Sequence, residues 1–173
     1  MSAEPVFIRA AGFVRESIVD GPGIRFVVFA QGCPHKCAGC HNEVTHDFSG
    51  GRKYETGDIL AEIEKNPLLS GVTFSGGEPF CQAEGFLDLA VKLKEKNINI
   101  LAYTGYTYEE LLSLSAGDSC IAGLLDNTDI LIDGRFVFEE RDLRLQFKGS
   151  ANQRYIDMNA TRERGALVTV EEL

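Results

Sequence analysis

Residues 31–42 read Gln-Gly-Cys33-Pro-His-Lys-Cys37-Ala-Gly-Cys40-His-Asn, which places three cysteines in a C-x3-C-x2-C spacing. Thiolates this close together can face one inorganic centre, and iron–sulfur clusters are held by cysteine thiolates. A fully ligated four-iron cluster takes four protein ligands, whereas this loop supplies three. The spacing therefore predicts a cluster in which one iron is left open to bind another molecule.

A structural zinc site is the alternative interpretation of the same loop, with His35, His41 or His46 as an added ligand. Zinc motifs usually contain two separated pairs of ligands, whereas the other cysteines, Cys81 and Cys120, are single and distant in sequence. The chain has five cysteines, an odd number, and three of them are crowded into eight residues. This pattern is typical of metal chemistry rather than of a disulfide framework, and it favours the cluster over zinc.

Strand and helix patterns alternate on both sides of the cysteine loop. Expected strands cover residues 24–30, 71–74, 98–102 and 129–132, with a further possible strand at 166–170, and expected helices cover 58–65, 83–96 and 107–114. Such alternation predicts an α/β fold with a largely parallel sheet and helices packed on it. A complete eight-fold barrel takes about 250 residues. We therefore expect residues 1–173 to form a single domain with an open, partial (β/α) barrel of about five or six mainly parallel strands.

The composition is that of an ordinary globular protein with an acidic surface. Hydrophobic residues make up 44% and charged residues 25% of the chain, which excludes a disordered or low-complexity protein. The formal charge of −9 argues against binding to nucleic acid or to anionic membranes. No segment approaches the roughly 20 apolar residues of a membrane span. Residues 1–10 lack the pattern of a secretory signal, so we expect a cytoplasmic protein with neither nucleic-acid nor membrane partners.

A second motif, Ser75-Gly-Gly-Glu78-Pro79, follows the expected strand at 71–74. Glycines let backbone carbonyls approach a ligand closely, and a carboxylate complements a positive charge. Ligands of open α/β sheets gather at the carboxyl ends of strands, where this motif and the cysteine loop both lie. A turn that simply ends the strand is the alternative interpretation of this motif taken alone.

The cysteine loop resembles the signature of the radical S-adenosylmethionine (SAM) enzymes, and Ser75–Pro79 resembles their GGE motif. The resemblance implies that Cys33, Cys37 and Cys40 hold a [4Fe-4S] cluster whose open iron binds the SAM amino and carboxylate groups. It implies reductive cleavage of SAM to a 5′-deoxyadenosyl radical, with no catalytic acid or base. In this family the residue before the third cysteine is often aromatic and lies near the adenine, and here it is glycine. The SAM-binding residues implied by the resemblance are Gly39, Cys40, His41, Gly76, Gly77 and Glu78.

Further segments are similar to the glycyl-radical-enzyme activases of this family, and in particular to those that act on anaerobic ribonucleoside-triphosphate reductase. The resemblance implies an oxidoreductase that generates a radical on one glycine of the large catalytic subunit of that reductase. It also implies a flavodoxin- or ferredoxin-type electron donor. The segments that carry the similarity are residues 20–25, 40–42, 103–106, 129–136 and 147–154.

Two other functions are compatible with the sequence. One is a radical SAM enzyme of the compact deazapurine-forming type, which acts on a small molecule, and the other is a non-enzymatic interaction module stapled by zinc. Two measurements distinguish these functions from that of an activase: the iron content of the protein, and whether SAM cleavage depends on a partner. A late basic run, formed by Arg135, Arg141, Arg144 and Lys148, is either a contact for a partner or a solvated edge of the fold.

Overall fold

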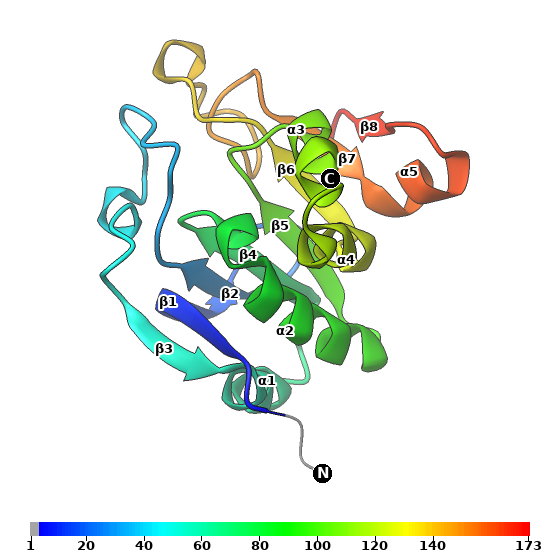
Figure 1. Cartoon of the computed structure of the whole chain (residues 1–173). Coiled ribbons are helices and arrows are strands. Elements are labelled where there is room, and N and C mark those ends of the chain that lie inside the picture. The colour runs from blue at the N-terminus through cyan, green and yellow to red at the C-terminus, as the bar shows by residue number, and fades with distance from the viewer. Residues whose placement is uncertain (1–3) are drawn as a thin grey trace.

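A sheet of eight strands forms the framework of the structure, a computed structural model that describes residues 4–173 (Figure 1). The strand order is β3-β1-β2-β4-β5-β6-β7-β8, and among the described residues no pairing joins β3 to β8, so the sheet is open. The strands are β1 (Phe7–Ser17), β2 (Arg25–Ala30), β3 (Arg52–Glu55), β4 (Gly71–Gly76), β5 (Asn99–Tyr103), β6 (Ile130–Asp133), β7 (Arg154–Asp157) and β8 (Thr169–Val170).

Strand direction changes between the centre and the edges of the sheet. The neighbouring pairs β2–β4, β4–β5 and β5–β6 are parallel, whereas β1 is antiparallel to β2 and β3, and β7 is antiparallel to β6 and β8. The predicted α/β class is confirmed, but the expectation of five or six mainly parallel strands is wrong. The missed strands lie at the edges. In β1 the pairing with β2 shifts register twice, between Ala10 and Gly12 and between Val14 and Ser17, which disrupts the alternation expected of a half-buried strand.

Five α-helices accompany the strands in the described part of the chain, namely α1 (Thr56–Glu64), α2 (Ala83–Glu95), α3 (Tyr108–Ser115), α4 (Ser119–Asn127) and α5 (Met158–Arg164). Helix α3 begins with a capping box: the Thr107 side chain accepts from the Glu110 backbone amide, and the Glu110 side chain accepts from the Thr107 backbone amide. Helices α4 and α5 were not predicted from the sequence. No helix in residues 4–173 combines the length and the apolar character needed to cross a bilayer.

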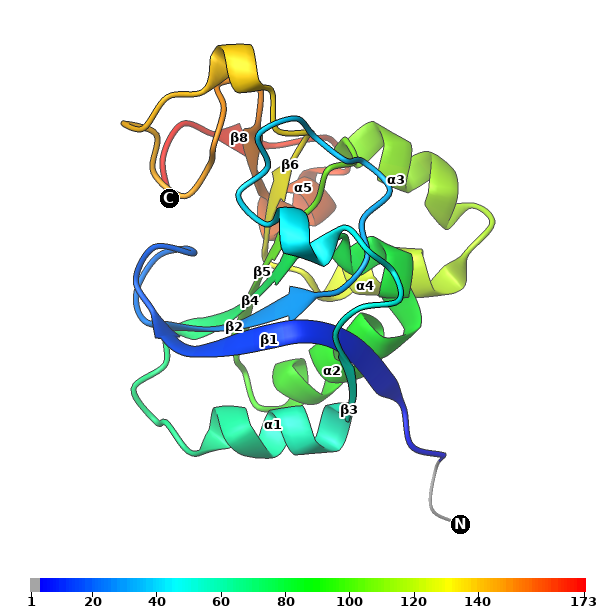
Figure 2. The ribbon, with the colours of Figure 1, turned by 90° about the vertical axis from the view of Figure 1, so that its left-hand side faces the viewer.

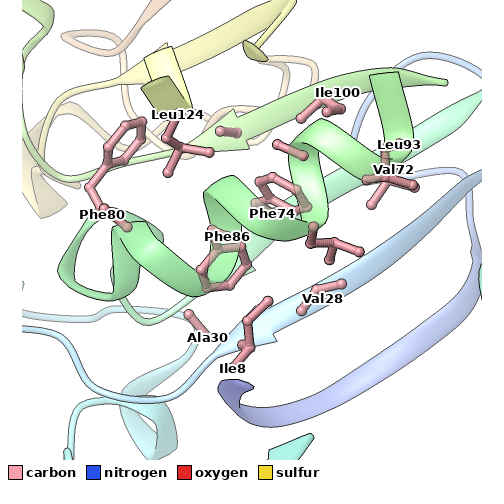
Figure 3. Packing of buried hydrophobic residues seen from close by; sticks show 14 of the residues in the cluster. Ile8, Val28, Ala30, Val72, Phe74, Phe80, Phe86, Leu93, Ile100 and Leu124 are labelled. Carbon is pink, nitrogen blue, oxygen red and sulfur yellow. The ribbon is translucent and has the colours of Figure 1, made fainter. Parts of the chain in front are cut away.

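The main hydrophobic core lies between α2 and the sheet (Figure 3). Phe86 of α2 packs edge-on against Phe74 of β4, with ring centroids 4.9 Å apart, and both side chains are fully buried. Burying a side chain of this size contributes about 1.5–3 kcal/mol to stability. Figure 2 shows that the cysteine-rich loop and the segment 134–153 lie beyond the same end of the sheet, away from α1 and α2. The core therefore supports the strands whose carboxyl ends carry both predicted motifs.

A buried arginine joins the parallel strands at the end opposite the cysteine loop. Arg25, at the start of β2, is 1% exposed and donates from Nε to Thr73 Oγ1 at 2.7 Å and from Nη2 to the Val72 carbonyl at 2.8 Å. It also reaches Asn99 Oδ1 at 3.0 Å, so that one side chain joins β2, β4 and β5. Burial lowers the pKa of the guanidinium to about 10. The last residue of the segment 20–25 is thus a structural tie in this protein.

Candidate functional site

A cavity of about 450 Å³ lies where the cysteine loop meets the carboxyl ends of the central strands. Four parts of the chain form its walls: the loop that follows β2, the ends of β4, β5 and β6, the segment 134–153, and Val19 and Asp20 from the turn between β1 and β2. A volume of several hundred Å³ is usual for a small-molecule or cofactor site. Parallel strands place such sites at their carboxyl ends, as the sequence predicted.

The three predicted cluster ligands, Cys33, Cys37 and Cys40, all line this cavity and all carry free thiols. Cys33 is buried, and the other two are half-buried. Desolvation raises the pKa of Cys33 and of Cys40 in the protein without a metal. Within residues 4–173, no three His, Cys, Asp or Glu side chains are grouped so as to hold one metal ion.

The cysteine loop is closed by hydrogen bonds at the base that carries Cys33. The Gln31 side-chain amide donates to the carbonyls of Val44 at 3.2 Å and of Asp47 at 2.6 Å. The Gly32 amide donates to the Thr45 carbonyl at 2.7 Å, and the Cys33 amide to the His46 carbonyl at 3.2 Å. These bonds satisfy backbone groups that a loop of this length otherwise leaves to solvent. Gln31 was not recognised from the sequence as a residue that shapes the loop.

The glycines of the second motif allow β4 to end directly against the cysteine loop. The Gly77 amide donates to the Ala30 carbonyl at 2.7 Å, and the Glu78 amide donates to the Gly32 carbonyl at 2.8 Å. A Cβ at Gly77 would lie 2.3 Å from the Gly32 oxygen. Glycine is therefore required there for close backbone approach, and the Gly76–Gly77 backbone forms part of the cavity wall.

The Glu78 side chain lies behind this wall and is fully buried. Its carboxylate binds His35 Nε2 at 2.8 Å and accepts from Thr104 Oγ1 at 3.0 Å, from the Gly105 amide at 2.9 Å and from the Phe80 amide at 3.1 Å. Several donors already surround a carboxylate that, by the resemblance to the radical SAM enzymes, was expected to bind SAM. That role of Glu78 stays a prediction, whereas its contact with the cysteine loop was not foreseen.

Of the remaining predicted SAM-binding residues, His41 borders the cavity and Gly39 does not. The His41 ring lies 5.6 Å from the ring of Phe136, and a Cβ at Gly39 would lie 2.7 Å from the Phe138 ring. Two phenylalanines of the segment 134–153 thus occupy the space beside the position where the family often has an aromatic residue. The similarity of residues 129–136 and 147–154 to the activases pointed to this segment, but not to the contact between Phe138 and Gly39.

The late basic run has partners within the chain. Its four cations contact Glu110, Asp142 and two aromatic rings, and Arg135, Arg141 and Arg144 stay exposed to solvent. Arg135 lies 3.5 Å from Glu110, Arg144 lies 2.8 Å from Asp142, Arg141 lies over the Phe138 ring and Lys148 lies over the Tyr155 ring. The two remaining cysteines, Cys81 and Cys120, border a separate hollow next to Phe80 and Asp118.

The donors that are present fit a [4Fe-4S] cluster with a small molecule beside it. Three soft thiol ligands border one cavity, and thiolates select iron–sulfur clusters. The His46 imidazole borders the same cavity, and its Nε2 is buried without a hydrogen-bond partner among the described residues. A buried polar atom of this kind usually has a partner such as a bound group or water.

Comparisons with known proteins also indicate a [4Fe-4S] protein. A family model described as a 4Fe-4S single cluster domain matches residues 19–156, which include both motifs. The anaerobic ribonucleoside-triphosphate reductase-activating protein of Vibrio cholerae is 37% identical over 144 residues, covering 79% of this chain and 89% of the relative. The protein of the same name from Haemophilus influenzae is 33% identical over 146 residues, with the same coverage. The pyruvate formate-lyase-activating enzyme of Clostridium pasteurianum is 41% identical over 104 residues, covering 55% of this chain and 44% of the relative.

Proposed function

Because this chain belongs to the 4Fe-4S single cluster family and to the anaerobic ribonucleoside-triphosphate reductase-activating proteins, we propose that it generates a glycyl radical on such a reductase. The protein is a SAM-dependent oxidoreductase with a [4Fe-4S] cluster, and its target is the large catalytic subunit of the reductase. Three free thiols and the Gly76–Gly77 backbone, which we call the glycine ledge, border one cavity. This observation carries the proposed function.

Residues at and around the cavity have distinct tasks in this proposal. Cys33, Cys37 and Cys40 hold the cluster. SAM is bound by Gly39, Cys40 and His41 on one side and by Gly76, Gly77 and Glu78 on the other. When bound, the reduced cluster and SAM supply the 5′-deoxyadenosyl radical that takes a hydrogen atom from the Cα of the target glycine. A glycyl Cα is unhindered and so within reach of the radical, and because a hydrogen atom moves as one unit, the protein needs no side chain that acts as acid or base. Its residues bind and orient the cluster and SAM. The loop contains no fourth cysteine, which would leave one iron of the cluster free to bind SAM.

The architecture supports a polypeptide as the substrate. We propose that residues 1–173 form one radical SAM domain with a partial barrel, in which the unpaired edges leave a side open for a loop of the reductase. The linear strand order supports this proposal, since β3 and β8 are not joined within residues 4–173. An electron donor of the flavodoxin or ferredoxin type would reduce the cluster. The acidic charge of −9 supports a protein without nucleic-acid or membrane partners, and a cytoplasmic location is part of the proposal.

The decisive experiment is the formation of a glycyl radical in a defined mixture. The protein is reconstituted with iron and sulfide without oxygen, and is expected to bind about four iron and four sulfide per chain. It is then mixed with SAM, a reductant and the large reductase subunit, and EPR is expected to show a glycyl radical on that subunit. Stoichiometric zinc in a colourless protein would refute the proposal. SAM cleavage that requires a small heterocycle and no reductase would refute it in favour of the small-molecule enzyme.

A further inference from the structure

His35 occupies the short segment between the first two predicted cluster ligands and reaches the end of a different strand. Its Nε2 lies 2.8 Å from Glu78 Oε2, and the two side chains are 4% and 0% exposed. An imidazole nitrogen and a carboxylate oxygen at this distance form a hydrogen bond. A hydrogen bond made in a buried place is electrostatically stronger than one made in water.

The Glu78 carboxylate extends this contact to a third part of the chain. Thr104 Oγ1 lies 3.0 Å from each carboxylate oxygen, and the Gly105 amide donates to Oε2 at 2.9 Å. Thr104 and Gly105 directly follow β5, whereas Glu78 follows β4. One buried carboxylate therefore joins the cysteine loop to the ends of both strands.

The chain also provides a fitted space for the imidazole. A Cβ at Gly105 would lie 2.2 Å from the His35 ring, so a glycine is needed where the ring rests. The Tyr106 ring meets the imidazole edge-on, with centroids 4.5 Å apart and an interplanar angle of 79°. The space left by Gly105, the contact with the Tyr106 ring and the hydrogen bond to Glu78 thus all hold the His35 side chain in one defined position.

We propose that His35 and Glu78 are positioning residues that latch the cysteine loop onto the ends of β4 and β5. The His35–Glu78 latch holds Cys33 and Cys37 at a defined place relative to the Gly76–Gly77 backbone. It thereby sets the spacing between the cluster ligands and the ledge that binds SAM. The effect on the loop follows from the structure alone, whereas the effect on SAM binding rests on the proposed function.

Amide hydrogen exchange of the metal-free protein tests the latch itself. The His35→Ala variant removes the donor and leaves a buried carboxylate short of a partner, so exchange within residues 33–40 is expected to be about tenfold to a hundredfold faster. His35→Gln retains an N–H donor and is expected to stay within about threefold of the original protein. Lys36→Ala, an exposed position in the same loop, is the matched control and is expected to leave exchange unchanged.

Unchanged exchange in His35→Ala would overturn the latch. If His35→Ala does not fold, His35→Gln decides the question. Protection of residues 33–40 in the glutamine variant then supports the latch, and its loss in an otherwise folded protein overturns it.

SAM affinity of the reconstituted variants tests the consequence for the site. Affinity is measured per cluster, by the change in the EPR signal on titration with SAM, so that partial loading with iron does not affect the result. The expected outcome is about tenfold weaker binding in His35→Ala and recovery in His35→Gln. A residue that only stabilises the fold would lower the melting temperature without changing the affinity per cluster. Unaltered affinity in iron-loaded His35→Ala would overturn the positioning role.

The two arms separate this proposal from the function on which it partly rests. If the original protein takes up no iron, the proposed function fails, and the exchange experiment still decides whether His35 latches the loop. If the original protein binds iron and SAM and the variants behave identically, the function stands and the latch fails.

Discussion

Replacing Gly77 by alanine should separate the end of β4 from the cysteine loop. The added methyl group would lie 2.3 Å from the Gly32 oxygen and 2.9 Å from the Gly32 carbonyl carbon. Both are backbone atoms, so no flexible side chain can turn aside. Reaching ordinary van der Waals contact requires a shift of about 1 Å between two segments that are joined by hydrogen bonds of 2.7 and 2.8 Å.

The cost follows from these contacts. Inserting a methyl group into a packed region costs about 1–3 kcal/mol. Weakening the Gly77–Ala30 and Glu78–Gly32 hydrogen bonds costs about 0.5–1.5 kcal/mol each. The free energy of unfolding should therefore fall by about 2–6 kcal/mol, compared with a total of about 5–15 kcal/mol for an ordinary domain. We expect a weakened protein whose cysteine loop no longer sits correctly against the ledge.

Urea unfolding followed by circular dichroism measures the first effect, and iron content with SAM titration measures the second. Gly12→Ala is the matched control, because no heavy atom lies within 4 Å of its added Cβ. That control should stay within about 1 kcal/mol of the original protein and bind iron and SAM normally. If Gly77→Ala unfolds like Gly12→Ala and binds SAM equally well, the close approach of the two segments is not what shapes the site.

Three further predictions concern the cluster ligands, the Glu109–Arg154 ion pair and the buried Arg25. Cys37→Ala should lose the cluster and SAM cleavage while Cys120→Ala keeps both; a brown, active Cys37→Ala protein would disprove the ligand assignment. Hydrogen bonds from Arg154 lower the pKa of Glu109 to about 2, so the stability contributed by this pair is present above about pH 4.3 and is lost as the pH falls toward 2. Arg154→Met should flatten that fall in acid titrations of unfolding, and an unchanged slope would contradict the pairing. Arg25→Lys should lower the unfolding free energy by about 2–3 kcal/mol, because a lysine cannot bond to β4 and β5 together; a melting temperature equal to that of the original protein would exclude this role.

The sequence predicted the centre of the fold better than its edges. Strands β2, β4, β5 and β6 have dense runs of apolar residues, and α2 has the stripe of Phe86, Leu89 and Leu93, which are signals of burial on a fixed period. Of the strands toward the edges, β8 falls within the expected strand at 166–170, whereas β1, β3 and β7 lack such a signal. In β3 three of the four residues are exposed, and β8 has only two residues. Pairing with neighbours far away in the chain determines these strands, and a local pattern does not contain that information.

At the site, the residues of the two motifs were predictable and their surroundings were not. Cysteine spacing indicates a common centre, because ligands close in sequence need little help from the fold to meet. Glu78, by contrast, meets His35 across 43 positions of sequence and Thr104 across 26. Phe138 likewise lies beside Gly39 although the two residues are far apart in the chain. Contacts of this kind depend on the ordering of the sheet. The sequence alone therefore attributed the Glu78 carboxylate to the ligand, whereas the structure shows that much of its hydrogen bonding is to the protein.

The EPR spectrum of the reduced, reconstituted protein, recorded with and without SAM, tests most directly whether three cysteines leave one iron of the cluster open. We predict that SAM changes the spectrum and that the change saturates at about one SAM per cluster. A spectrum that stays the same at saturating SAM would mean that the protein itself already ligates the fourth iron, and would contradict the assigned function.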